Sequence, residues 1–317
     1  MKRLYLAVDL GGTHVRTAAA DDGAQLMGRL DEPTRTEGGW HTGVRQIVEM
    51  ARRSVQEAGV PWDTISRAIV ASPGPLDRQR GFVFNPPNLA GWENVPLRDE
   101  LERELGLDVT VDNDANAAAL GEYRFGAGRG TRNLVYITVS TGIGAGIVSE
   151  GKLLPGTTGI AGEIGHTVIE RNGPRCNCGS YGCLETLASG TAIARRYREA
   201  LERENVPQGR AGYSTAGDVV RMATAGDERA RAVFLDAADA LGVGVTNAIN
   251  LLNPDVVVIG GGVSKAGDLL FDTVRDVVAR RALQPARDAA RIVPAQLGED
   301  VGLVGALAVG LDIDQVD

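Results

Sequence analysis

Apolar runs of strand length, glycine turns and amphipathic stretches follow one another along the chain. Residues 3–10 form a mostly apolar run, which a glycine turn at 11–13 separates from a second run at 15–20. Two short apolar runs joined by such a turn predict a β-hairpin. Apolar residues then recur at helical spacing over 44–58, which predicts a helix that covers the sheet.

Strands and helices continue to alternate in the rest of the chain, which indicates an α/β architecture. An apolar repeat over 233–249 predicts a long helix, and Asn253-Pro254 should end it. A polar, glycine-containing stretch near 202–217 is expected to be a surface excursion. The other expected strands are 25–30, 65–71, 109–112, 134–139, 146–148 and 256–259, and the other expected helices are 97–105 and one that starts near residue 113 or 114.

The second half of the chain repeats the pattern of the first. From residue 133 an apolar strand again ends in a glycine turn and is followed by a short strand, so that residues 8–11 align with residues 139–142. Two strand–turn–strand units, each followed by helices, predict a duplicated domain with a cleft between the halves.

The composition is that of a globular protein with small-molecule partners. The 317 residues include 43% hydrophobic and 23% charged side chains, enough for roughly two domains with their own cores. The formal net charge of -8 disfavours general binding to nucleic-acid phosphates or to an anionic membrane. No uninterrupted apolar run approaches the roughly 18 residues of a spanning helix, so we expect a cytoplasmic protein.

Asp9 and the turn after it are candidates for magnesium and phosphate binding. Gly11, Gly12 and Thr13 offer bare N–H groups and a hydroxyl to phosphate oxygens, while the Asp9 carboxylate faces hydrated Mg2+. An ordinary hairpin turn would also explain these glycines. A second glycine turn in the other half of the chain favours phosphate binding, because the alternative would then require two unrelated hairpin turns that each combine glycine with threonine.

That second turn carries Thr141 and Gly142, again a hydroxyl beside a glycine. Neither G-x-x-x-x-G-K-[ST] nor G-x-G-x-x-G occurs, which disfavours a P-loop enzyme and a Rossmann dehydrogenase. Gly260, Gly261 and Gly262 follow an apolar strand. They either let a flat adenine lie against the backbone or form a tightly packed turn from strand to helix.

Three cysteines and a histidine form a strong metal-binding signal. Cys176, Cys178 and Cys183 fall within eight residues, and His166 precedes them. Three thiolates and one imidazole are the ligands of a closed tetrahedral zinc site, which leaves no position for a reacting water. We therefore expect a structural zinc; the alternatives are a cluster of free thiols or one disulfide with a spare cysteine.

Asn113 and Asp114 stand where a strand ends and a helix begins. Side chains at such positions commonly cap the free N–H groups of the helix. The helix N-terminus also keeps a carboxylate ionised, and an ionised aspartate beside a hydroxyl can take its proton during phosphoryl transfer. Both interpretations remain open from these residues alone.

Two further groups have the chemistry of a sugar site. Glu163 and Glu185 flank the first and last metal ligands, so that a bound zinc would hold both in fixed positions. The segment 85–92 supplies amides and the aromatic ring of Trp92, which suit sugar hydroxyls, although a proline-rich surface loop would look the same.

Taken together, these segments resemble the ROK family of sugar kinases and repressors, and within it the bacterial glucokinases. The likeness covers essentially the whole chain, and its last two motifs are the most specific. The motifs are Asp9-Leu10-Gly11-Gly12-Thr13-His14-Val15-Arg16, Asn88-Leu89-Ala90-Gly91-Trp92, Asn113-Asp114-Ala115-Asn116-Ala117-Ala118, Glu163-Ile164-Gly165-His166 and Cys176-Asn177-Cys178-Gly179-Ser180-Tyr181-Gly182-Cys183-Leu184-Glu185.

The resemblance implies an actin-like (ribonuclease H-like) duplicated α/β fold, with ATP, Mg2+ and a hexose in a cleft between two domains. A small domain would contain residues 1–114 and the final helix at about 301–317, and a large domain residues 115–300. The implied reaction is phosphorylation of the 6-hydroxyl of glucose, with Asp114 as the general base. Implied sugar contacts are Asn88, Asn113, Asp114, Glu163, His166 and Glu185, implied ATP contacts are Gly11, Gly12, Thr13, Thr141, Gly142, Gly261 and Gly262, and His166 would bind zinc through its other ring nitrogen.

Three rival interpretations stay open. N-acetylglucosamine, N-acetylmannosamine, fructose and allose kinases share nearly all of these motifs. A sugar-responsive repressor is disfavoured, because the first phosphate motif begins at Asp9 and leaves no room for an N-terminal DNA-binding domain. A filament-forming actin relative would need neither the zinc nor the sugar loop. The resemblance also favours a homodimer or homotetramer.

Overall fold

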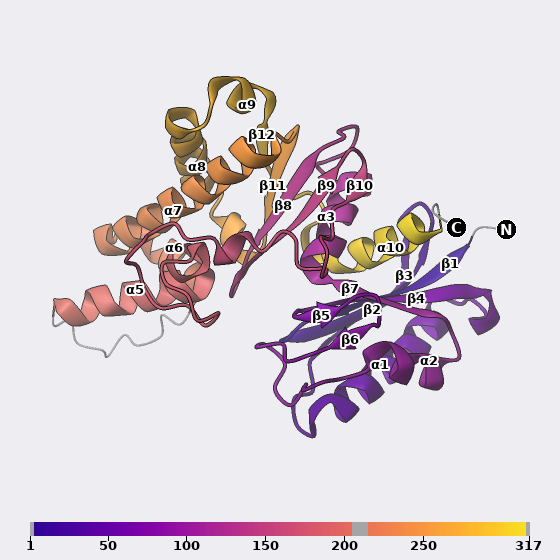
Figure 1. Cartoon of the computed structure of the whole chain (residues 1–317). Helices are drawn as coiled ribbons and strands as arrows, with labels where there is room; N and C mark the ends of the chain where they lie inside the picture. Colours follow the sequence, from indigo (N-terminus) through magenta and orange to yellow (C-terminus); the bar gives the residue numbers. More distant parts are fainter. Residues whose placement is uncertain (1–2, 205–214, 315–317) are drawn as a thin grey trace. The chain divides into compact units, whose positions relative to one another are not determined.

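Two five-stranded mixed sheets organise the protein, one in each of two compact units (Figure 1). The computed structural model describes residues 3–204 and 215–314. The chain divides into a first unit of Met1–Gly130, Leu153–Ala161 and Gln296–Asp317 and a second unit of Thr131–Lys152 and Gly162–Ala295.

The sheet of the first unit has the strand order β3-β2-β1-β4-β7. β1, β2 and β3 are antiparallel neighbours, whereas β4 and β7 run parallel to β1. Antiparallel neighbours need only short turns, and parallel neighbours need the longer crossovers that helices provide here. The strands are β1 (Leu4–Leu10), β2 (His14–Asp21), β3 (Leu26–Pro33), β4 (Ile65–Ser72) and β7 (Val109–Asn113).

Helices cover both faces of this sheet. α1 packs across β2 and β3, while α10 packs on β1, β4 and the helix α3. Figure 1 shows α1 and α2 on one face of the sheet and α10 on the other. These elements are α1 (Gly39–Glu57), a 3-10 turn (Trp62–Thr64), the small hairpin β5 (Leu76–Asp77) and β6 (Phe82–Val83), α2 (Leu97–Leu105), α3 (Asp114–Phe125), a 3-10 turn (Gly298–Asp300) and α10 (Val301–Ile313).

The contacts of α3 decide where the first unit ends. Gly305 of α10 lies against the backbone of Ala117 in α3, where an added Cβ would come within 2.5 Å of the Ala117 carbonyl oxygen. Gly121 meets the same glycine from α3. α3 therefore belongs to the first unit by its contacts, whereas the boundary between the two domains was expected at residue 114.

The sheet of the second unit has the order β10-β9-β8-β11-β12. α7 lies against α4, α5, α6 and α8, and its apolar residues join the core of this unit. The strands are β8 (Leu134–Val139), β9 (Ile143–Ser149), β10 (Lys152–Leu153), β11 (Val256–Gly260) and β12 (Arg291–Pro294). The helices are α4 (Leu184–Ala188), α5 (Gly190–Arg203), α6 (Ala216–Thr224), α7 (Glu228–Leu252), α8 (Asp268–Arg281) and α9 (Gln284–Ala289), with 3-10 turns at Ile164–His166 and Gly262–Ala266.

The two sheets share one topology, which confirms the duplication. β1, β2 and β3 correspond to β8, β9 and β10, and β4 and β7 correspond to β11 and β12. The last hairpin pairs are Leu10 with Val15 and Val139 with Ile143. Leu10 therefore corresponds to Val139, and the sequence alignment of 8–11 with 139–142 is wrong by two residues. Either alignment places glycines at the turn, so the residue types alone could not show which alignment is correct.

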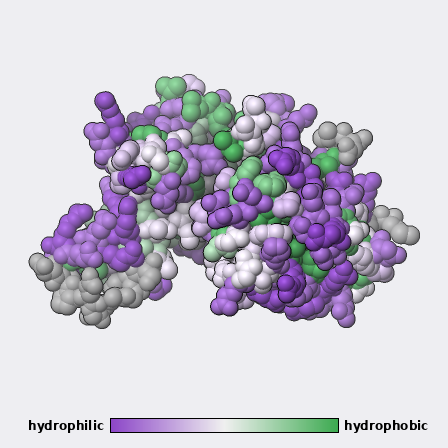
Figure 2. All heavy atoms as spheres, turned by 60° about the horizontal axis from the view of Figure 1, so that its bottom comes forward, coloured by the Kyte–Doolittle hydropathy of each residue, from purple (hydrophilic) through white to green (hydrophobic). Residues whose placement is uncertain are grey.

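The long helix α7 is a core helix. By length and composition it could cross a membrane, but 56% of its apolar window is buried inside the protein. It ends where Asn253 adopts a left-handed conformation with φ 45°, as Asn253-Pro254 predicted. On the face in Figure 2, hydrophilic residues predominate, with smaller apolar patches among them. Residues 205–214 of the expected surface excursion lie outside the described residues, and α5 and α6 occupy its two ends.

Candidate active site

The first glycine turn joins β1 to β2 and lies against the Asn88 loop. The N–H of Gly11 donates to the His14 carbonyl at 2.9 Å, and the N–H of Thr34 donates to the Thr13 carbonyl at 2.8 Å. A Cβ on Gly12 would lie 2.4 Å from the carbonyl oxygen of Asn88. Glycine at position 12 therefore allows a close approach of two backbones, and the predicted phosphate turn and the predicted sugar loop meet there.

Asp9, on β1, is fixed from two sides. Arg16 on β2 donates from Nη1 to Asp9 Oδ2 at 2.9 Å and from Nε to Asp31 at 2.8 Å. The carboxylate also packs against Gly302 in the first turn of α10, where an added Cβ would lie 2.3 Å from Asp9 Cγ. Burial raises the pKa of Asp9, and the hydrogen bond from Arg16 opposes that effect.

The loop between β6 and α2 presents Asn88 at the surface. Leu89 and Trp92 are 2% and 1% exposed and anchor the loop in the core of the first unit. The Trp92 ring packs against Gly43 of α1. The interpretation of the Trp92 ring as a sugar-binding group is therefore wrong, because a ring buried in the core offers no face to a ligand, whereas Asn88 is exposed.

Asn113 and Asp114 take separate roles at the start of α3. Asn113 is the N-cap, and its side-chain oxygen accepts from the N–H groups of Ala115 at 2.9 Å and Asn116 at 3.3 Å. Asp114 is the first helical residue and is exposed, and its Oδ1 also accepts from the Ala115 N–H at 2.8 Å. The capping role thus belongs to Asn113, and the exposed carboxylate lies at the positive end of the helix.

The second glycine turn joins β8 to β9 and is held by α5. Gly190 donates from its N–H to the Ser140 carbonyl at 2.7 Å, and the Thr191 hydroxyl donates to the Thr141 carbonyl at 2.8 Å. This support by α5 was not predicted from the sequence. The signal was Ser189, a cap residue just before Gly190, whose hydroxyl accepts from the Ala192 N–H.

Glu185, on α4, reaches the same turn. Its Oε2 accepts from the N–H of Ile143 at 2.9 Å. A Cβ on Gly142 would lie 2.5 Å from that oxygen, so glycine at position 142 makes room for the carboxylate. The structure therefore places Glu185 directly beside the predicted phosphate turn.

Gly261 and Gly262 differ in what surrounds them. Gly261 has φ 85°, and an added Cβ would lie 2.4 Å from the Val139 carbonyl oxygen. Gly261 is thus required for the tight turn from β11 to the following 3-10 helix. A Cβ on Gly262 would meet no atom within 4 Å. The space beside Gly262 is left open by the chain itself.

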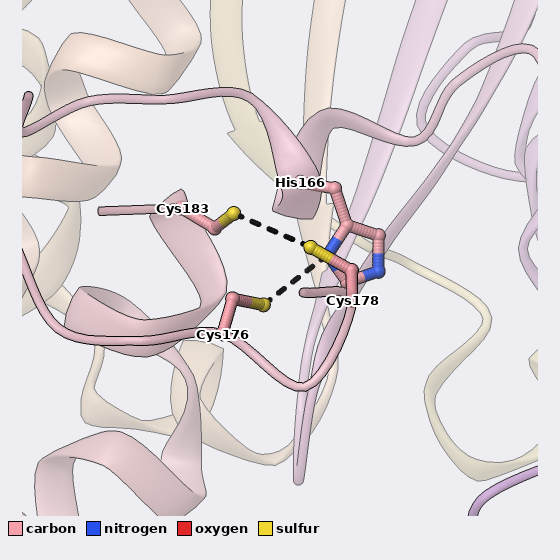
Figure 3. A group of neighbouring side chains, drawn as sticks. All are labelled: His166, Cys176, Cys178 and Cys183. Atoms are coloured by element: carbon pink, nitrogen blue, oxygen red, sulfur yellow. Dashed lines mark hydrogen bonds between the residues drawn. The ribbon is translucent and has the colours of Figure 1, made fainter. Parts of the chain in front are cut away.

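His166, Cys176, Cys178 and Cys183 converge in the second unit, and their ligand atoms all lie within 4.8 Å of one another (Figure 3). Cys178 Sγ and Cys183 Sγ are 3.7 Å apart, and Cys176 Sγ is 3.6 Å from His166 Nδ1. Sulfur atoms about 2.3 Å from a tetrahedral zinc are about 3.8 Å from each other. The spacing therefore fits a zinc ion at the centre of the four ligands.

Backbone pairing builds this loop from both ends. Val168 pairs with Cys183, and Arg175 pairs with Tyr181, in short antiparallel bridges. Hydrogen bonds from the Ser180 backbone lower the pKa of the Cys178 thiol, whereas burial raises the pKa of Cys183 to about 12. Zinc binds thiolates, so its binding must displace the Cys183 proton.

The other ring nitrogen of His166 faces a carboxylate. His166 Nε2 lies 3.9 Å from Glu163 Oε2, one residue before the short 3-10 helix that carries the histidine. The residues predicted from the zinc motif are thus assembled in one place. Glu163 and His166 Nε2 form a polar edge beside the metal ligands.

Two sheets of one topology, each with a glycine turn after its first strand, place the chain in the actin-like class of α/β folds, which the matching ROK sugar kinase structures share. The ROK family model matches residues 5–312, and the chain belongs to the ROK family. It is 38% identical to a glucokinase of Thermotoga maritima, with 97% of each chain covered, and 40% identical to one of Halalkalibacterium halodurans, with 96% and 93% covered. A ROK family glucokinase of Streptomyces griseus, solved with glucose and AMPPNP, matches with a TM-score of 0.83 and 32% identity over 96% of this chain and 98% of that one.

Proposed function

We propose that the chain is an ATP-dependent glucokinase that transfers the γ-phosphoryl group of ATP to the 6-hydroxyl of glucose. The observation that carries the proposal is Asp114, an exposed carboxylate at the start of α3, next to the N-cap residue Asn113. The glucokinase names of nearly full-length relatives, and the glucose and AMPPNP of the Streptomyces griseus structure, support the substrates.

Asp114 acts as the general base in this proposal. It accepts the proton of the 6-hydroxyl while the sugar oxygen attacks the γ-phosphorus, and the bond to the departing ADP breaks. It lies at the N-terminus of α3, where the helix dipole attracts a negative charge. The other proposed sugar contacts are Asn88, Asn113, Glu163, His166 and Glu185.

Backbone N–H groups and hydroxyls of the two glycine turns bind the phosphates. Gly11, Gly12 and Thr13 form one group, and Thr141 and Gly142 form the other. The adenosine lies by Gly261 and Gly262, where position 262 leaves open space. Mg2+ neutralises phosphate charge when bound, and the Asp9 carboxylate, already held by Arg16, would hold it through coordinated water.

A structural zinc would be held by His166 Nδ1, Cys176, Cys178 and Cys183 and would lock the loop that carries Glu163 and His166. His166 Nε2 then meets a sugar hydroxyl, since metallation at Nδ1 fixes the tautomer. Zinc thiolates suit a reducing compartment, so we place the enzyme in the cytoplasm. We propose a homodimer or homotetramer, which light scattering after size exclusion would test.

The decisive experiment follows ADP release by the purified chain with ATP-Mg. Glucose is compared with N-acetylglucosamine, N-acetylmannosamine, fructose, mannose and allose at matched concentrations. The proposal expects the highest kcat/KM for glucose. A higher kcat/KM for another hexose would make that hexose the preferred substrate. If no sugar in the set caused ADP release, the kinase assignment would be overturned.

A further inference from the structure

Asp112 is a buried carboxylate directly before the proposed catalytic pair. It lies at the end of β7 and is 1% exposed. Arg78 Nη2 donates to its Oδ2 at 2.6 Å. On the other oxygen it accepts from the Asn113 N–H at 2.8 Å and from Asn116 Nδ2 at 3.2 Å. A buried charge is tolerated only with such partners, and Arg78 is the cation among them.

Arg78 comes from a different element, the hairpin β5–β6. Arg98, near the start of α2, fixes that hairpin by donating from Nη2 to the Arg78 carbonyl at 3.0 Å and from Nη1 to the Gln79 carbonyl at 2.6 Å. The hairpin then runs straight into the loop that presents Asn88. The Arg78 guanidinium therefore ties the base of the sugar loop to the end of β7.

On its other side, Asp112 orients the first turn of α3. Its Oδ1 binds one backbone and one side-chain donor of that turn, at Asn113 and Asn116. Asn116 Oδ1 is buried without a hydrogen-bond partner in the described part of the chain, so Asp112 alone orients that amide. Asp114 stands between these two anchored residues.

We propose that Arg78 is a positioning residue for phosphoryl transfer, which holds the Asn88 loop and the Asp114 carboxylate in register through Asp112. The proposal rests on the proposed function. Small errors of alignment between a base and its substrate hydroxyl cost rate steeply. The hydrogen bonds that hold the two glycine turns come from His14, Thr34, Gly190 and Thr191 rather than from this ion pair, so we expect a smaller effect on nucleotide binding. Arg78 itself does not need to touch the sugar.

Arg78→Met is the first test. We expect kcat/KM for glucose to fall about 10- to 100-fold, with a higher glucose KM and a KM for ATP within about twofold of wild type. Arg78→Lys should recover part of the loss, because a point charge still neutralises Asp112 but cannot reproduce the guanidinium geometry. Arg103→Met, which removes an exposed arginine of α2 in the same unit, is the matched control and should match wild type.

A second variant separates positioning from folding. Arg78→Met leaves a buried carboxylate unpaired and can unfold the unit, whereas Arg78→Met with Asp112→Asn removes both charges. The double variant should unfold cooperatively near the wild-type temperature and still lose glucose kcat/KM. Wild-type kinetics in a folded Arg78→Met or double variant would overturn the inference. Absence of glucose phosphorylation by the wild-type enzyme would instead overturn the proposed function.

Discussion

Neighbouring residues with similar polar side chains do different work in this protein. Asn113 caps α3, Asp114 faces solvent, and Asp112 is buried in an ion pair. The sequence indicated the place but left open which residue caps the helix, because Asn and Asp are equally good caps. Only the backbone conformation at Asn113 decides it. For Trp92 the sequence offered no way to decide, because no local pattern distinguishes a buried ring from a ring that binds a ligand.

Asp114→Asn should lose most turnover and keep the fold. The amide preserves size and hydrogen bonding at the helix start but cannot accept the hydroxyl proton, so we expect kcat to fall at least about 100-fold. Steady-state kinetics and thermal unfolding of the same preparation test this. A kcat near that of wild type would refute the base assignment.

Gly261→Ala and Gly262→Ala should separate a structural glycine from a binding one. Position 261 has φ 85° and faces the Val139 carbonyl, so alanine should destabilise the fold by about 1–2 kcal/mol or more. Position 262 has open space, so alanine should leave stability unchanged and raise the KM for ATP. Urea unfolding and ATP titration check both. Equal effects of the two changes on both quantities would contradict the distinction.

At the scale of elements, the zinc loop was the most predictable part of the site. Cysteine spacing shows the ligands directly, because few other arrangements crowd three thiols into eight residues. The support of the Thr141 turn by α5 was not predicted, because the Ser189 cap indicates that a helix starts there but not that it contacts the Ser140 and Thr141 carbonyls.

Cys178→Ser should remove the metal and loosen its loop. A structural zinc can contribute on the order of 10 kcal/mol to folding, so zinc content and melting temperature should fall together. Metal analysis and calorimetry before and after chelation give the readout. Full zinc content in the variant would show that Cys178 is not a ligand.

Asp255 joins the starts of β8 and β11. Its Oδ2 accepts from the N–H groups of Arg132 and Asn133, and these hydrogen bonds lower its pKa. A lowered folded-state pKa adds stability above the unfolded value near 4, and that stability is lost as the pH falls through the folded value. Asp255→Asn should therefore cost about 1 kcal/mol at pH 7 and progressively less below pH 4.

Urea midpoints for wild type and Asp255→Asn across that pH range measure the difference. Asp272→Asn, an exposed acid in the same unit, is the control. A cost that does not change with pH would mean that the charge contributes nothing.

At the scale of the whole molecule, the α/β class and the duplication were readable from the sequence. Apolar strands and glycine turns repeat in the same order, and the two sheets do share one topology. The alignment of the first half of the chain on the second was wrong by two residues. Side chains on a strand alternate between its two faces, so a shift of two residues keeps every side chain on the same face. The grouping of α3 with α10 was not readable either, since it depends on glycines far apart in the sequence.

Substrate binding should stabilise the whole chain by mass action. A ligand at a hundred times its Kd adds about 2.7 kcal/mol to the free energy of unfolding. We expect glucose with AMPPNP to raise the melting temperature, and allose with AMPPNP to raise it less. Equal shifts with both sugars would argue against glucose as the preferred substrate.

The first unit takes α10 from the end of the chain. α10 packs on β1 and β4, strands that a ribosome makes long before it reaches residue 301. During synthesis the face of the N-terminal sheet that α10 covers therefore stays exposed until nearly all of the second unit has been made. Exposed apolar strands are prone to aggregation, so slow translation of the last segment should make this chain dependent on chaperones.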